Sequence, residues 1–290
     1  MLAWILNFFP QELIALLVAF CSVLTGVIDS GEPTVTGEIT LVSEQKLVFE
    51  DAMCAGQGIT TDGTYWYTSG TMVGVGYAVL AKWDAATMER VAYNPDAIPR
   101  DLRNSYKSNH IGGISYYNGK VYAAVENETD DHPCIVTYNP DKLTVIDVYH
   151  LSNEFLPDGV PWCAVDGERG YLYASPFRDV DAILAFDLQT MEFDHFLPLS
   201  ETVTRIQGGE VYGDKLYLSY DVQDSNSDQI LTVDLGSGAV STIATRTVPS
   251  AAGNEAEGLT VCPMPDGSLI HVLDYDKTVG VYLRSYRYSD

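Results

Sequence analysis

The sequence predicts an all-β fold, a five-bladed β-propeller closed by an N-terminal strand. Three observations predict it: five segments repeat one hairpin pattern, the repeats lie one blade length apart, and a spare strand precedes the first repeat. The marker aromatic of each hairpin, or a histidine in its place, recurs at intervals of 56, 51, 44 and 54 residues, at Trp66, Tyr122, Tyr173, Tyr217 and His271. These intervals have the size of a four-stranded blade.

Each repeat opens with the same hairpin. Small or Gly residues begin a first strand, a turn follows, and an aromatic-rich second strand comes next, in segments 56–70, 110–127, 161–176, 206–221 and 255–276. Four of the turns contain dipeptides that favour hairpins, namely Asp62–Gly63, Asn118–Gly119, Gly213–Asp214 and Asp266–Gly267. These segments therefore predict the two inner strands of five blades.

The outer strands follow from the rest of each repeat. The first four repeats continue into a third and a fourth strand, as in IVTYNPDKLTVI, whereas the fifth stops after its third strand, VGVYLRSYRYSD. Segment 37–50 has no blade of its own, so we expect it to supply the missing outer strand and close the ring. A sixth blade would need another repeat, and the spare segment 92–109 is too short for one.

The N-terminus contains an uncharged apolar run, residues 13–28, which we expect to be helical. It is short for a bilayer span and suits the apolar region of a signal peptide. No Lys or Arg precedes Lys46, and Leu24–Thr25–Gly26 is an imperfect cleavage site. We assign 1–28 to a signal peptide or membrane anchor, 29–37 to a linker and 38–290 to the propeller. The protein is then expected outside the cytoplasm, in contact with a membrane only through its N-terminal segment.

Composition limits the partners. The chain of 290 residues is 46% hydrophobic, enough for a full core, and its formal net charge is −24. Such acidity argues against a nucleic-acid partner, and it favours either solubility alone or the binding of divalent cations or cationic ligands. The five Cys form no CxxC motif and no metal-type spacing with His, and the sequence selects no disulfide pair.

Three stretches resemble the repeats of quinoprotein-like, SMP-30-like and lactonase-like propellers: GGISYYNGKVYAAVE (112–126), GGEVYGDKLYLSYD (208–221) and EAEGLTV (255–261). The resemblance covers nearly all of 38–290 and implies the propeller fold. In calcium-dependent lactonase-like members, an acidic residue before a Gly joins Asn and Asp side chains around a central metal. Glu257–Gly258 matches that element. The resemblance therefore implies a metal-dependent hydrolase or lyase, with Glu257 as metal ligand and His110 as general base.

Propeller geometry indicates a site independently of the resemblance. The starts of the first strands and the ends of the second strands gather around one mouth of the central channel. The starts are Gln57, His110, Trp162, Gln207 and Glu257, and the ends include Glu126, Asn127, Asp221 and Asp274. Oxygen ligands suit Ca²⁺, so we expect Glu257, Glu126, Asn127, Asp221 and Asp274 to hold it. We expect Trp162, Gln207 and Gln57 to contact a small polar ligand, and His110 and Glu257 to be catalytic. The opposite mouth receives the hairpin turns and shows no such set.

Each of these residues has a structural alternative. Glu257 either binds a ligand or bonds backbone N–H groups between blades, and His110 either catalyses or forms a structural hydrogen bond. Trp162 is either a ligand platform or a wedge between blades, whereas His271 is expected to pack in the core. The sequence contains no GxSxG, P-loop or HExxH motif. A module that binds a divalent cation or small polar ligand is the favoured function, with a lactonase-type enzyme or a structural interaction domain as alternatives.

Overall fold

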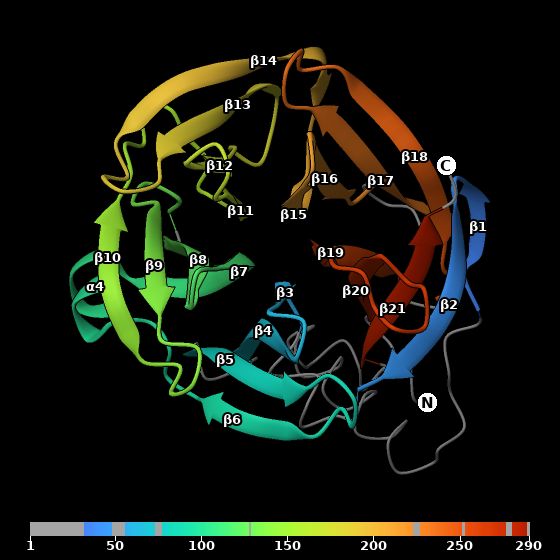
Figure 1. Ribbon diagram of the computed structural model, residues 1–290. Helices are drawn as coiled ribbons and strands as arrows, with labels where there is room; N and C mark the ends of the chain where they lie inside the picture. Colours follow the sequence, from blue (N-terminus) through green and yellow to red (C-terminus); the bar gives the residue numbers. More distant parts are fainter. Residues whose placement is uncertain are drawn as a thin grey trace, which may run out of the picture.

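Five antiparallel sheets surround a common axis, so the protein is a five-bladed β-propeller, as predicted (Figure 1). The structure is a computed structural model that describes residues 32–47, 56–72, 77–127, 129–222, 227–250, 253–276 and 280–288. The apolar helix expected within residues 1–28 lies outside the described residues. Among the helices that are described, none is long and apolar enough to cross a bilayer.

The first three blades each contain four strands that follow one another from the axis outward. Blade 1 contains β3 (Ile59–Thr61), β4 (Tyr65–Met72), β5 (Tyr77–Asp84) and β6 (Arg90–Asn94). Blade 2 contains β7 (Ser108–Tyr117), β8 (Lys120–Asn127), β9 (Cys134–Tyr138) and β10 (Val145–His150). Blade 3 contains β11 (Cys163–Asp166), β12 (Tyr171–Ala174), β13 (Val180–Asp187) and β14 (Phe193–Val203).

The last two blades combine strands from both ends of the chain. Blade 4 contains β15 (Ile206–Tyr212), β16 (Lys215–Tyr220), β17 (Ser227–Asp234), β18 (Val240–Thr247) and, outermost, β1 (Thr34–Gly37). Blade 5 contains β19 (Asn254–Val261), β20 (Ile270–Asp276), β21 (Gly280–Tyr288) and, outermost, β2 (Ile39–Lys46). β2 pairs with β21 in antiparallel register, with Ile39 opposite Tyr288. Residues 34–37, which the sequence assigned to a linker, instead pair with β18.

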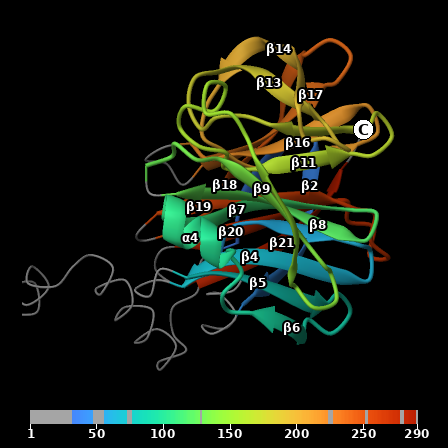
Figure 2. The same cartoon turned by 90° about the vertical axis from the view of Figure 1, so that its left-hand side faces the viewer.

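The axis opens at two mouths that differ in what surrounds them. Helix α4 (Arg100–Tyr106) leads into β7 on the side where the first strands begin, which we call the α4-side mouth. The first hairpin of each blade turns at the other end, the hairpin-side mouth. Figure 2 shows α4 at one end of the strands and the C-terminus at the other. The mouth that faces the reader in Figure 1 is therefore the hairpin-side mouth.

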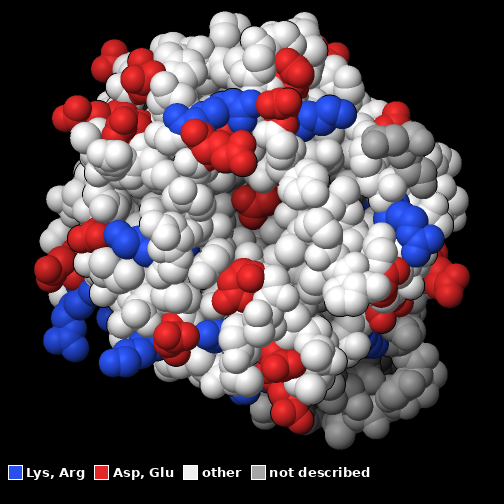
Figure 3. Space-filling view, in the orientation of Figure 1, with Lys and Arg blue, Asp and Glu red and all other residues white. Residues whose placement is uncertain are grey.

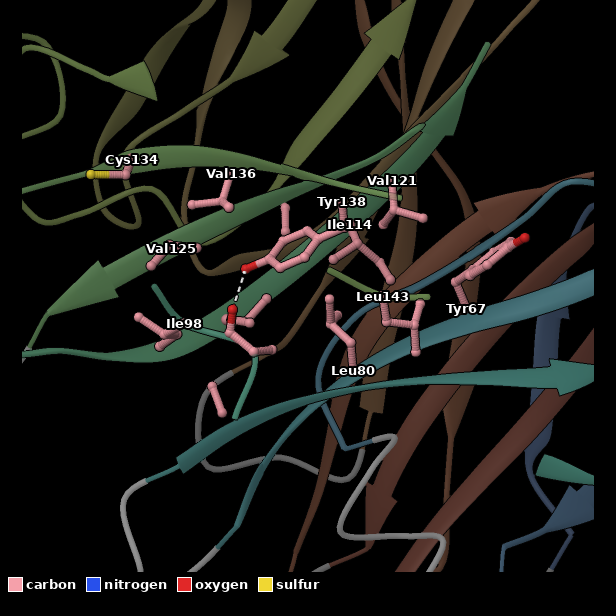
Figure 4. Close-up of a cluster of buried hydrophobic side chains, with 14 of the residues drawn as sticks. Tyr67, Leu80, Ile98, Ile114, Val121, Val125, Cys134, Val136, Tyr138 and Leu143 are labelled. Atoms are coloured by element: carbon pink, nitrogen blue, oxygen red, sulfur yellow. Dashed lines mark hydrogen bonds between the residues drawn. The ribbon is translucent and has the colours of Figure 1, made fainter. Parts of the chain in front are cut away.

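Apolar packing between neighbouring blades forms the core. Each of five buried clusters joins the facing sheets of two adjacent blades, and two of them join blade 5 to blades 1 and 4. The cluster of Figure 4 includes Leu80 of blade 1 together with Ile114 and Val121 of blade 2. The Tyr138 hydroxyl there donates to the Ala97 carbonyl at 3.1 Å, which satisfies a polar atom inside an apolar layer.

The five marker residues of the repeats lie on the second strands and are all buried. His271 packs edge-on against Trp66 of the adjacent blade, with ring centroids 4.8 Å apart, as expected for a core position.

Closer to the axis, glycines let the first strands touch. A Cβ atom at Gly112 would lie 2.1 Å from the Pro161 oxygen, and one at Gly258 would lie 2.5 Å from the Ile59 nitrogen. Backbone therefore fills the middle of the axis at this level.

Candidate functional site

Glu257 is buried near the α4-side mouth, on β19. Its side-chain Oε1 accepts a hydrogen bond from Gln57 Nε2 at 3.3 Å, which joins blade 5 to blade 1. Burial raises the pKa of Glu257 well above its ordinary value, and the nearby charges of Glu255 and Asp221 raise it further. Burial and the neighbouring acids therefore favour the protonated form of this carboxyl relative to an exposed glutamate.

His110 and Glu126 form a second pair at this mouth, on β7 and β8. His110 Nε2 lies 4.0 Å from Glu126 Oε2, and the Thr71 hydroxyl lies 3.5 Å from Nδ1. Burial lowers the pKa of His110 to about 4. Burial also raises the pKa of Glu126 to about 8, with a further increase from Asp130. Both side chains are therefore largely neutral at pH 7. The two expected catalytic residues have different neighbours: His110 lies next to Glu126, and Glu257 is bonded to Gln57.

Two of the expected calcium ligands, Asp274 and Asp221, are paired with arginine. Asp274 is fully buried between Arg246 and Arg284, with nitrogen–oxygen distances of 2.8 and 2.7 Å. Burial alone would raise the pKa of Asp274, but the two guanidinium groups outweigh it and the pKa is lowered. Asp221 is ion-paired with Arg205, whose Nε lies 3.1 Å away. These carboxylates are therefore committed to arginine.

Asn127 organises the turn after β8. Its Nδ2 donates to the Tyr106 carbonyl at 2.9 Å and to Asp131 Oδ1 at 2.7 Å, and its Oδ1 accepts from the Asp131 N–H at 3.1 Å. The five expected ligands thus do not form one set. Among the residues that the structure describes, no three His, Cys, Asp or Glu side chains are arranged to hold a metal ion.

Trp162 occupies the position of a wedge between blades. Its side chain is fully buried, and Nε1 donates to the Ser175 hydroxyl at 3.0 Å. The indole covers Gly209 of β15 so closely that a Cβ atom there would lie 2.8 Å from the ring. No face of the indole is exposed in this structure, which favours the wedge between blades over the ligand platform. Gln57 and Gln207, in contrast, are half-buried at the α4-side mouth.

The hairpin-side mouth contains a cavity that the sequence did not predict. Its volume is about 530 Å³, and all five blades line it, with Asp62, Tyr117, Glu168, Glu210 and Cys262 among the lining residues. Figure 3 looks at this mouth and shows a hollow near the centre of the ring with acidic atoms at its floor. We call this the axial cavity. Four of its described lining residues are Asp or Glu and none is Lys or Arg.

Glu210, on β15, is a buried carboxyl in this cavity, and it accepts hydrogen bonds from three other blades. Its Oε1 accepts from the Ser115 hydroxyl at 3.1 Å, and its Oε2 accepts from Thr260 at 3.1 Å and Thr60 at 3.3 Å. Among the described residues no Lys or Arg is ion-paired with it. The other buried acid of the cavity, Asp166, is neutralised by Arg169 at 3.0 Å.

Burial determines the charge of Glu210. It raises the pKa of Glu210 to about 7, against the lowering effect of the hydrogen bonds from Ser115, Thr260 and Thr60. The carboxyl is therefore divided between its two protonation states near neutral pH, and a cation beside it would favour the ionised state. Buried acids that titrate near neutral pH are common in functional sites.

Sequence reasoning missed Glu210 because it considered only the ends of strands. The repeats, however, contain a signal. When the first strands are aligned on their glycines, Thr60, Ser115, Glu210 and Thr260 occupy the same position, two residues after Gly58, Gly113, Gly208 and Gly258. Three hydroxyls and one carboxyl in one channel-facing position predict the hydrogen-bonded layer that the structure contains.

Comparisons with known proteins support the fold alone. No protein-family model matches the chain, and no curated protein matches it. A bifunctional GH43-CE protein of Bacteroides eggerthii is similar in structure, with a TM-score of 0.54 and 15% identity over 79% of this chain and 32% of that one. Hydrazine synthase of Kuenenia stuttgartiensis matches at a TM-score of 0.43 and 16% identity, over 75% of this chain and 55% of its own. The chain thus spans less than two thirds of either protein.

Proposed function

We propose that the propeller is a binding module whose axial cavity takes a small ligand with a cationic group, such as an organic ammonium. The observation that supports this most is the buried, hydroxyl-bound Glu210 in an acidic cavity lined by all five blades. A concave site with a few convergent polar groups is the usual form of a small-molecule site. This ligand is an organic cation at the hairpin-side mouth, a different site from the α4-side mouth where the sequence predicted calcium.

Electrostatics and aromatic groups both favour an ammonium. The cavity places Asp62, Glu168 and Glu210 around one space, and none of the lining residues that the structure describes is Lys or Arg. Tyr116 and Tyr117 add aromatic rings to the lining. A cation gains from carboxylates and from the faces of such rings. Because the cation stabilises the ionised form of Glu210, its binding releases a proton when the pH is below about 7.

The test compares hexylamine with hexanol, which has the same chain length and no charge, by titration calorimetry of the full chain at pH 8. We expect the amine to bind about tenfold more tightly, the equivalent of ~1.4 kcal/mol. This preference should weaken at pH 6, where Glu210 is largely protonated, and it should be reduced in Glu210→Gln at both pH values. Glu154→Gln, which changes an exposed loop acid, is the matched control. Equal binding of the two probes would contradict the proposal.

We also propose that the apolar segment within residues 1–28 exports the propeller from the cytoplasm. The support is the length of the apolar run and its lack of charged residues, together with the acidic composition of the chain that follows. A reporter fused after Asp290 should be found outside the cytosolic fraction, and deletion of residues 1–28 should return it to the cytosol. Cytosolic location of the intact fusion would contradict export.

A further inference from the structure

A second cavity adjoins the axial cavity between blades 2 and 3. Its volume is about 540 Å³, and it shares Tyr117 and Gly167 with the axial cavity as lining residues. We call it the outer cavity. Two cavities with a common wall offer a single elongated ligand two places to bind, provided that their chemistry suits its two ends.

The wall between the cavities is the ring of Tyr117. The ring lies directly on Gly167, where a Cβ atom would come within 1.9 Å of the ring carbon Cε2, and its hydroxyl donates to the Gly167 carbonyl at 3.4 Å. Only a residue without a side chain permits this contact. The ring therefore has a fixed place at the boundary, where an apolar linker could lie against it.

The outer cavity differs from the axial cavity in charge. Lys120 and Arg169 line it, with Asp187 as its acid. Asp187 Oδ1 accepts hydrogen bonds from the backbone N–H groups of Gln189 and Thr190, in the turn that follows it, at 3.0 and 2.9 Å. Arg169 is bound to Asp166 and Asp214. The Lys120 ammonium is 3.6 Å from Asp147, in a solvent-exposed pair that a ligand carboxylate can replace at little cost.

We propose that the ligand is a zwitterionic chain, with its ammonium in the axial cavity, its apolar middle over Tyr117 and its carboxylate beside Lys120 in the outer cavity. This inference rests on the proposed function, since it assigns the ammonium to the axial cavity, and it adds the chemical class of the whole ligand. A free amino acid with a long side-chain amine and a short linear peptide both belong to this class.

The test compares ε-aminohexanoate with hexylamine by calorimetry at pH 8. The two probes have the same chain length and the same ammonium, so they differ in the carboxylate alone. We expect the zwitterion to bind at least about fivefold more tightly, because its carboxylate gains a charged partner. Lys120→Gln should remove this gain, so that ε-aminohexanoate and hexylamine bind the variant with similar affinities. Lys142→Gln, an exposed lysine outside the lining, should leave both affinities unchanged.

A short pair of probes gives the opposite expectation. Glycine and methylamine also differ in a carboxylate, but in glycine it would stay inside the acidic axial cavity, so glycine should bind more weakly than methylamine. Binding of hexylamine without any gain for ε-aminohexanoate would overturn the zwitterion inference and leave the axial site standing. Failure of hexylamine itself to bind would overturn the proposed function and this inference with it.

Discussion

Hydroxyl groups from three blades donate hydrogen bonds to the Glu210 side chain. The protonation of Glu210 therefore affects both the charge of the axial cavity and the stability of the fold. A buried acid whose folded-state pKa is raised stabilises the fold only while it is protonated. Asp274 shows the opposite case, because two buried guanidinium groups keep it ionised. At the scale of single residues, the partner of each acid therefore decides its role, and the sequence does not show these partners.

Glu210→Gln should change the pH dependence of stability. With a folded-state pKa of about 7 against an ordinary value of 4.5, the wild-type protein loses stability as the pH rises from about 4.5 through 7. From pH 5 to pH 8 this loss amounts to about 2–3 kcal/mol, and a glutamine does not titrate. Between pH 5 and pH 8, the free energy of unfolding measured with urea should therefore fall by about 2–3 kcal/mol less in the variant than in the wild type. A constant difference would refute the raised pKa.

Asp274→Asn should be strongly destabilising. It leaves Arg246 and Arg284 buried with one countercharge fewer, and loss of one partner of a buried ion pair costs about 3–5 kcal/mol. The control is Asp147→Asn, which breaks the exposed pair with Lys120 and should cost less than about 1 kcal/mol. The free energy of unfolding by urea measures both. Similar losses in the two variants would contradict the buried pairing of Asp274 with Arg246 and Arg284.

Much of the arrangement of the strands was predictable. Asn118 and Gly119 have φ values of 47° and 73°, the left-handed conformations that a two-residue hairpin turn requires, and the dipeptide predicted this turn. The number of blades follows from such local signals. β1 was missed, because a four-residue strand between Pro33 and Glu38 acquires its strand character only from its partner β18. Its existence depends on tertiary contact, which sequence propensity does not contain.

We infer that the pairing of β2 with β21 keeps the ring closed, and truncation tests this. A chain that begins at residue 32 keeps both β1 and β2, and it should fold and remain soluble. A chain that begins at residue 51 exposes the edges of β18 and β21 and removes Ile39 from the cluster between blades 4 and 5. It should melt at a lower temperature and aggregate. Equal melting temperatures and solubility would show that β2 is not needed for closure.

At the scale of the whole molecule, the sequence predicted a binding site at the α4-side mouth, whereas the site that we propose from the structure lies at the opposite end of the axis. Of the residues that it named at the α4-side mouth, Asp274 pairs with arginine and Trp162 packs between blades. The axial cavity forms instead where hairpin turns of all five blades meet, a neighbourhood created only by closure of the ring. Charge composition predicted an affinity for cations, and the fold determines where those charges gather.

If the axial cavity selects cations, Cys262 should report it, because this thiol lies inside the cavity. This thiol is half-buried and lines the cavity, and burial together with the charges of Glu210 and Asp62 raises its pKa. The measurement compares the rates at which a cationic and an anionic methanethiosulfonate of similar size modify Cys262, followed by peptide mass spectrometry at pH 8. Because the same thiolate attacks the sulfur of both reagents and displaces methanesulfinate from each, the ratio of the rates reports the local potential.

We expect the cationic reagent to react with Cys262 at least about tenfold faster, because an acidic cavity concentrates cations. The ratio should fall in Glu210→Gln and in the presence of saturating hexylamine. A cysteine introduced at the exposed Ser152, on a loop away from the hairpin-side mouth, should show a smaller ratio that reflects the net charge alone. Equal rates at Cys262, or a ratio no larger than that at position 152, would contradict a cation-selective axial cavity.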